Sequence, residues 1–144
     1  MKFIIITLLL AACVNKADSP EAALKEFIDS RLEKIVAKDF VVERTTGKLR
    51  SSLEAMTEEE FTRFADLRSI KRDTFKVLSK NCQEKRCYVT YSLGYRQAPE
   101  GKTTWHSEVK KIAEVQWVEG KWLIADVSNL KTYHESVETI EVSP

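Results

Sequence analysis

Residues 115–124 read Val-Gln-Trp-Val-Glu-Gly-Lys-Trp-Leu-Ile, and this stretch decides the fold. At its centre, Glu119 and Gly120 form a two-residue turn signal between two runs rich in β-branched and aromatic residues. This pattern predicts a β-hairpin. Trp117 and Trp122 then lie opposite each other as an aromatic cross-strand pair, which is more typical of packing than of ligand recognition.

The hairpin extends beyond this stretch on both sides. One strand is predicted from Thr103 or Thr104 to Val118, and its partner from Lys121 to Val127. Successive side chains of a strand point to opposite faces, so the apolar positions mark the face that turns inward. The residues predicted to line a pocket on that face are Trp105, Trp117, Trp122 and Ile124, together with Tyr91 of an earlier strand.

Two polar side chains of the hairpin are weak candidates for chemistry. Asp126 is two residues beyond Ile124, so alternation carries its carboxylate toward the pocket, where it would suit a general base. Alternatively, Asp126 lies where the strand frays, solvated or paired with Lys111. His106 falls on the polar, outward face, unless a bulge near Lys110 turns it inward.

Two cysteines flank a second predicted hairpin. Cys82 and Cys87 are separated by the hydrophilic residues 83–86, between β-like runs at 75–78 and 88–95. A four-residue loop would set the cysteines opposite one another, within bridging distance. The spacing does not fit a C-x-x-C redox motif, and no histidine or second cysteine pair lies nearby in the sequence for a metal. A structural disulfide is therefore favoured over either alternative.

The N-terminal half has helical periodicity. Ser19 is predicted to cap a helix that starts at Pro20, and apolar residues recur at helical spacing over Leu24–Val36. A short helix is expected within Leu49–Met56, and another after the capping box Thr57–Glu60. Helices followed by strands predict an α+β domain, with two or three N-terminal helices packed on a curved antiparallel sheet of about four strands.

Two segments resemble the nuclear transport factor 2-like superfamily. Residues 19–23 and 37–40 are similar to the first helix, and the corner at its end, of small bacterial lipoproteins in that superfamily, and residues 115–124 are similar to their terminal hairpin. The resemblance covers most of residues 19–133. It implies a cone-shaped fold with a pocket between sheet and helices. Members include isomerases and dehydratases that use a pocket Asp, His or Tyr, and also domains without catalysis.

The first residues resemble a lipoprotein signal peptide. Lys2 and a short apolar run precede Leu10-Ala11-Ala12-Cys13, which is similar to a lipobox. The resemblance implies that Cys13 is lipidated and anchors the mature chain in the cell envelope, on the periplasmic face of the outer membrane in a Gram-negative host. The run is too short to span a bilayer. The expected organisation is a signal peptide at 1–12, a lipidated tether at 13–18, a single domain at 19–135 and a loose tail at 136–144.

Composition narrows the functional classes. Without residues 1–12, 22 basic residues balance 22 acidic ones, so the electrostatic attraction expected of a nucleic-acid-binding protein is missing. The sequence has four glycines and no phosphate-binding loop, nucleophile–base pair or metal-spaced cluster, so no cofactor or metal is expected. We expect a non-catalytic envelope domain that binds a partner protein or a small hydrophobic ligand. The alternative is a small isomerase-like or dehydratase-like enzyme with Asp126 as general base.

Overall fold

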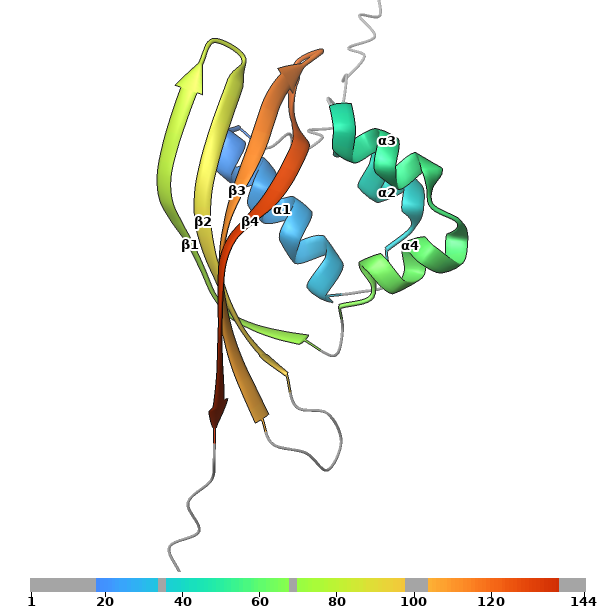
Figure 1. The fold of residues 1–144 in the computed structure, drawn as a ribbon. Helices are drawn as coiled ribbons and strands as arrows, with labels where there is room; N and C mark the ends of the chain where they lie inside the picture. Colours follow the sequence, from blue (N-terminus) through green and yellow to red (C-terminus); the bar gives the residue numbers. More distant parts are fainter. Residues whose placement is uncertain (1–17, 34–35, 68–69, 98–103, 138–144) are drawn as a thin grey trace, which may run out of the picture.

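A computed structural model describes residues 18–33, 36–67, 70–97 and 104–137. These residues form four helices followed by four strands (Figure 1). The helices are α1 (Pro20–Glu33), α2 (Lys38–Val42), α3 (Gly47–Ala55) and α4 (Glu58–Ala65). The strands are β1 (Ile70–Gln83), β2 (Arg86–Gln97), β3 (Thr104–Val118) and β4 (Lys121–Val137). The predicted α+β class is confirmed, with four helices where two or three were expected. Cys13 and the predicted signal peptide lie outside the described residues.

The four strands form one antiparallel sheet in the order β1-β2-β3-β4. Glu119 (φ 48°) and Gly120 (φ 83°) make the predicted turn between β3 and β4. The four-residue loop predicted between β1 and β2 is wrong, because the ladder continues through the pair Gln83 and Arg86 and leaves a two-residue turn. Both turns contain residues in the left-handed backbone conformation that two-residue hairpin turns require.

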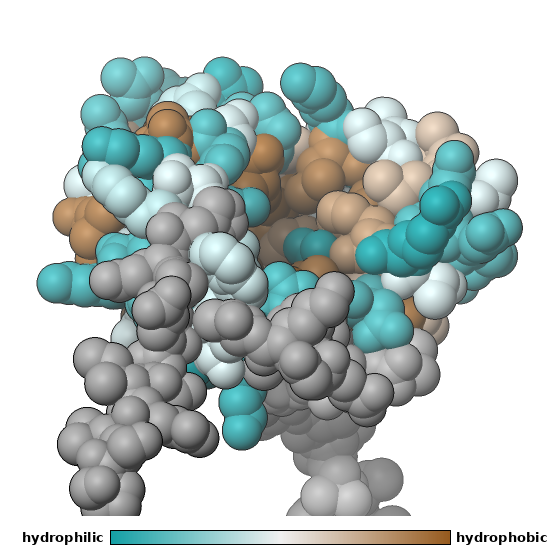
Figure 2. Space-filling view, turned by 60° about the horizontal axis from the view of Figure 1, so that its bottom comes forward, coloured by the Kyte–Doolittle hydropathy of each residue, from teal (hydrophilic) through white to brown (hydrophobic). Residues whose placement is uncertain are grey.

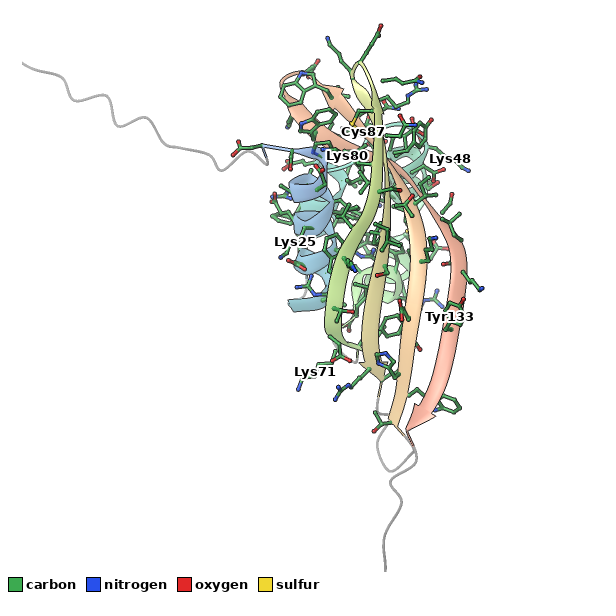
Figure 3. The ribbon with its side chains drawn as sticks, turned by 90° about the vertical axis from the view of Figure 1, so that its left-hand side faces the viewer. Lys25, Lys48, Lys71, Lys80, Cys87 and Tyr133 are labelled. Carbon is green, nitrogen blue, oxygen red and sulfur yellow. A yellow bond between two sulfur atoms is a disulfide. The ribbon has the colours of Figure 1, made fainter. Side chains whose placement is uncertain are left out.

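The predicted disulfide joins β1 to β2 close to the turn of this hairpin. Cys82 and Cys87 are direct cross-strand partners, with their Cα atoms 4.0 Å apart and an S–S bond between them. Cys87 is buried at the end of the sheet beside the hairpin (Figure 3). The bridge therefore fixes the register of β1 against β2.

Each edge strand is bulged twice, whereas the central ladder is continuous. The pairing skips Asp73 and Leu78 on β1, and Ala125 and Leu130 on β4. The β2–β3 register runs without a shift from Arg86 to Gln97. Bulges bend a strand and increase its local twist, so both edges of the sheet curve toward the helices (Figure 1).

Helix α1 packs its apolar stripe on the concave face of the sheet. Leu24 and Phe27 belong to the same buried core as Val89, Ala113 and Val115 of β2 and β3. Two ion pairs join α1 to the edge strand β1, where Figure 3 shows Lys80 near the start of the helix. The first is Glu21–Lys80, with Oε1 and Nζ 2.5 Å apart, and the second is Asp29–Arg72.

The predicted helix starts are confirmed by their hydrogen bonds. The Ser19 hydroxyl accepts from the Ala22 N–H at 3.1 Å, and Thr57 and Glu60 make the reciprocal bonds of a capping box. The short helix α2 was not predicted. Residues 44–46, which follow it, pair with Ile124 of β4 and thereby hold α2 and α3 at that edge of the sheet. None of the described helices is long and apolar enough to cross a membrane.

Candidate functional site

A cavity of about 490 Å³ opens between α1, the segment around α4 and the concave face of the sheet. Figure 2 shows this face hollowed, with hydrophobic side chains in the walls and hydrophilic ones at the rim. We call this space the α1 cavity. Its lining residues are Phe27, Ile28, Arg31, Leu32, Leu49, Phe64, Leu67, Ile70, Tyr91, Leu93, Tyr95, Val109, Lys111, Val127, Asn129 and Thr132.

The walls of the α1 cavity are mostly apolar, and its polar groups are of few kinds. The aliphatic and phenylalanine side chains come from both helices and sheet. The polar members are two cations, two tyrosines, one asparagine and one threonine. The described lining includes no carboxylate, histidine or cysteine. Such a surface suits a ligand that is largely apolar and makes a small number of polar contacts.

Arg31 is the most buried charge of the cavity. Its guanidinium carbon lies 4.1 Å from the centre of the Phe64 ring and 5.6 Å from that of Phe27, a cation–π arrangement. Its Nη2 donates to the Phe64 carbonyl at 2.9 Å, which ties α1 to the end of α4. Its Nε is buried and has no hydrogen-bond partner among the described residues. Burial lowers the pKa of Arg31 to about 10, so the group remains charged at neutral pH.

Tyr91 and Lys111 are the ionisable neighbours of Arg31 in the cavity. Burial raises the pKa of Tyr91 to about 12, against an opposing effect of the Arg31 charge, so its hydroxyl stays neutral and can donate a hydrogen bond. Burial also lowers the pKa of Lys111, and the like charge of Arg31 lowers it further. Two cations therefore share this low-dielectric space.

Of the five residues predicted to line a pocket, only Tyr91 lines the α1 cavity. Ile124 is buried in the core and Trp122 packs partly buried against it. Trp117 stacks edge-on against Trp122 at 5.2 Å, which is the predicted cross-strand pair, but it is 38% exposed. Trp105 is 44% exposed near the start of β3. Trp105 and Trp117 lie toward the two ends of the long β3 strand, and Trp122 lies beside Trp117 on β4.

The predicted inward orientation of Asp126 is wrong. Because Ala125 is bulged, Asp126 pairs with Glu114, whose side chain is on the outward face, whereas Val127 pairs with Ala113 on the inward face. Val127, and not Asp126, therefore lines the cavity. The Asp126 carboxylate accepts a hydrogen bond from the Val127 N–H at 2.9 Å.

His106 lies on the face opposite the cavity, as strand alternation predicts. Its Nδ1 is 3.5 Å from a carboxylate oxygen of Asp73, which also accepts from Arg96 at 2.9 Å. This small cluster contributes no residue to the described cavity lining. Within the described ranges, no three histidine, cysteine, aspartate or glutamate side chains gather in a way that would hold a metal ion.

Sequence reasoning missed the two cations of the cavity, although signals for both exist. Arg31 follows Phe27 by four positions and Ile28 by three, so it sits within the apolar stripe of α1. Lys111 has the same strand parity as Val109 and Ala113, which marks it as inward-facing. A charge inside an apolar stripe was the informative feature in both cases.

Comparison with known proteins gives similarity at the level of the fold. No family model matches the sequence, and no curated protein matches it. The solution structure of a SEC-C motif containing protein from Rhodopseudomonas palustris is similar, with a TM-score of 0.56 and 16% sequence identity. The match covers 81% of this chain and 82% of that chain. At this identity the similarity concerns the fold alone.

The predicted membership of the nuclear transport factor 2-like lipoproteins is wrong. The solved structure reported above for its similar fold is that of a SEC-C motif containing protein, and no family model supports the assignment to that superfamily. Residues 37–40 are also not a corner at the end of the first helix, because they lead into the separate helix α2. The quoted motifs, a Ser-Pro helix start and a Gly-Lys-Trp hairpin, satisfy local capping and turn geometry. Such local solutions carry little information about family.

Proposed function

We propose that this domain binds a small, mainly apolar ligand in the α1 cavity and does not transform it. The observation that carries the proposal is the cavity itself, whose volume of about 490 Å³ falls within the range of small-molecule sites, about 300–1,000 Å³. Its aliphatic and aromatic walls favour apolar surface, which gains roughly 0.8 kcal/mol for each buried methylene group.

The polar residues of the cavity support binding better than proton-transfer catalysis. An isomerase or dehydratase needs a base within hydrogen-bonding reach of the substrate. The candidate base Asp126 is on the other face of β4, and the described cavity lining offers cations, neutral hydroxyls and an amide. These groups can orient a ligand by hydrogen bonds and charge, but a protonated arginine or lysine does not abstract a proton.

Filling the cavity is expected to abolish this binding. Val127→Phe should reduce the affinity for dodecan-1-ol, an uncharged apolar probe, by about tenfold or more, because the ring occupies ligand space. Native mass spectrometry and calorimetric titration of the purified chain measure the change. The matched control is Ser128→Phe, which adds the same ring at the next position of β4, exposed and paired with Ile112 on the outward side. A wild-type protein that binds no probe with this apolar tail, or whose binding of the alcohol is unchanged by Val127→Phe, contradicts the proposal.

We further propose that the domain is tethered to a membrane of the cell envelope through Cys13, on the lipobox-like residues 10–13. Expressed in a bacterium that processes lipoproteins, the wild-type chain should incorporate an alkyne-labelled palmitate and fractionate with membranes, and Cys13→Ser should lose both properties. The control with Cys82 and Cys87 both changed to serine keeps the label, since neither cysteine follows a lipobox-like sequence. An unlabelled, soluble wild-type chain would rule out the tether and leave the cavity proposal standing.

A further inference from the structure

We propose that the ligand of the α1 cavity is an anionic amphiphile, an apolar chain or ring that ends in a carboxylate or phosphate monoester held by Arg31 and Lys111. This inference rests on the proposed function, because it concerns the same cavity and names the chemical class that fits it. Three observations support it, namely the unused donor of Arg31, the uncompensated charge of the cavity and its size.

Arg31 is held in place yet keeps a buried donor free. The bond from Nη2 to the Phe64 carbonyl and the stacking on the Phe64 ring fix the plane of the guanidinium. The Nε–H, on the same plane, is buried without a partner among the described residues. A buried polar group without a hydrogen bond is unfavourable, and native structures rarely leave one unsatisfied. Arg31 lines the cavity, so a small shift of its side chain toward a bound ligand would let a ligand oxygen supply the missing acceptor.

The charge of the cavity is unbalanced in the direction that an anion would correct. Arg31 and Lys111 both line it, and the described lining contributes no acidic side chain. Elsewhere in the domain, two partly buried arginines are paired with acids: Arg72 with Asp29, and Arg44 with Glu26 at 2.9 Å. Buried like charges repel each other and lose hydration, so a carboxylate or phosphate between them is stabilised by both. The neutral hydroxyl of Tyr91 adds a donor for the same group.

The size of the cavity sets the apolar part of the ligand. An apolar cavity of about 150 Å³ holds one benzene ring, and the α1 cavity has about 490 Å³. It therefore accommodates one medium-length acyl chain or a molecule of a few rings. Leu32, Leu49 and Leu93 are among the side chains that would contact this apolar part. A two-chain lipid exceeds this space.

Paired ligands with the same tail test the head group. The purified full-length chain is titrated with dodecanoate, dodecyl phosphate and dodecan-1-ol by calorimetry. We expect at least one of the two anions to bind about tenfold or more tightly than the alcohol, because charge-assisted hydrogen bonds are stronger than neutral ones. Preference between the two anions identifies the head group.

Apolar replacements of the cations locate the effect. Arg31→Met and Lys111→Met should each reduce the affinity for the preferred anion more than the affinity for the alcohol, with a difference of about tenfold for Arg31→Met. Lys110→Met is the matched control, because Lys110 is exposed on the outward face of the same strand. Thermal unfolding of each variant checks that the fold persists, and binding of the alcohol checks that the cavity does.

The outcomes separate the two proposals. If alcohol and anions bind wild-type protein equally, or if Arg31→Met weakens both classes equally, the anionic head group is refuted and the apolar cavity remains. If none of the three molecules binds, the proposed function and this inference fail together. Selective loss of anion binding in Arg31→Met and Lys111→Met, with Lys110→Met unchanged, establishes the inference.

Discussion

Replacing Leu24 by alanine is expected to lower the free energy of unfolding by roughly 2–5 kcal/mol. Leu24 is completely buried and belongs to the core that joins α1 to the concave face of the sheet. The substitution deletes three side-chain carbon atoms. Their apolar contacts are lost, and a cavity remains because the surrounding strands relax only partially. Since a domain of this size is stable by about 5–15 kcal/mol, the variant should be close to unfolding on mild heating.

Urea unfolding followed by circular dichroism measures this loss as a lower midpoint with an unchanged slope. The matched control is Leu130→Ala, the same substitution at a bulged and 54% exposed position of β4, where the effect should stay within about 0.5 kcal/mol. Because α1 also carries Arg31, the Leu24 variant should bind the anionic probe more weakly. A loss of less than about 1 kcal/mol would mean that α1 is not docked on the sheet as described.

Much of the fold could be predicted because its signals are local. The hydroxyl of Ser19 and the pair Thr57 and Glu60 satisfy the free N–H groups at helix starts, and this chemistry depends only on neighbours in sequence. The Glu119-Gly120 turn is equally local, because the residues themselves admit the required backbone conformation. The cysteine pair followed once a hairpin was placed around it.

What could not be predicted depends on distant partners. Because of the bulge at Ala125, the side chains of Ile124 and Asp126 lie on opposite faces of β4. We relate the bulge to a tertiary contact, since the backbone of Ile124 also forms hydrogen bonds with residues 44 and 46. A strand that forms hydrogen bonds with β3 along one side and with a loop along the other departs from the simple alternation of side chains between two faces. The candidate base was misplaced for this reason. A pocket between sheet and helices was expected, but most of the lining of the α1 cavity escaped prediction, because it depends on how α1 and α4 lie over the bent sheet.

A second prediction with a large expected effect concerns Gly94, the only glycine within the described strands. A Cβ at Gly94 would lie 2.5 Å from the Oγ1 of Thr74, its direct cross-strand partner on β1. Cβ atoms essentially never lie within 3.0 Å of a heavy atom to which they are not bonded, so one of the two groups must shift. The threonine side chain is branched at Cβ, which restricts rotation about χ1, so moving Oγ1 away costs a change of rotamer or a shift of the bulged edge strand. Gly94→Ala should therefore lower the free energy of unfolding by about 1–3 kcal/mol.

A second substitution identifies the clash as the cause. Thr74→Ala removes Oγ1 and leaves only the Thr74 Cβ, at 3.7 Å, and His106, at 3.8 Å, both ordinary contacts. In that background Gly94→Ala should be neutral or stabilising by up to about 1 kcal/mol, because alanine has less conformational freedom than glycine in the unfolded chain. Urea unfolding of the wild type, both single variants and the double variant yields the coupling energy. If the loss persists in the double variant, the strand itself requires glycine there, and the close approach of β1 to β2 is not what constrains the position.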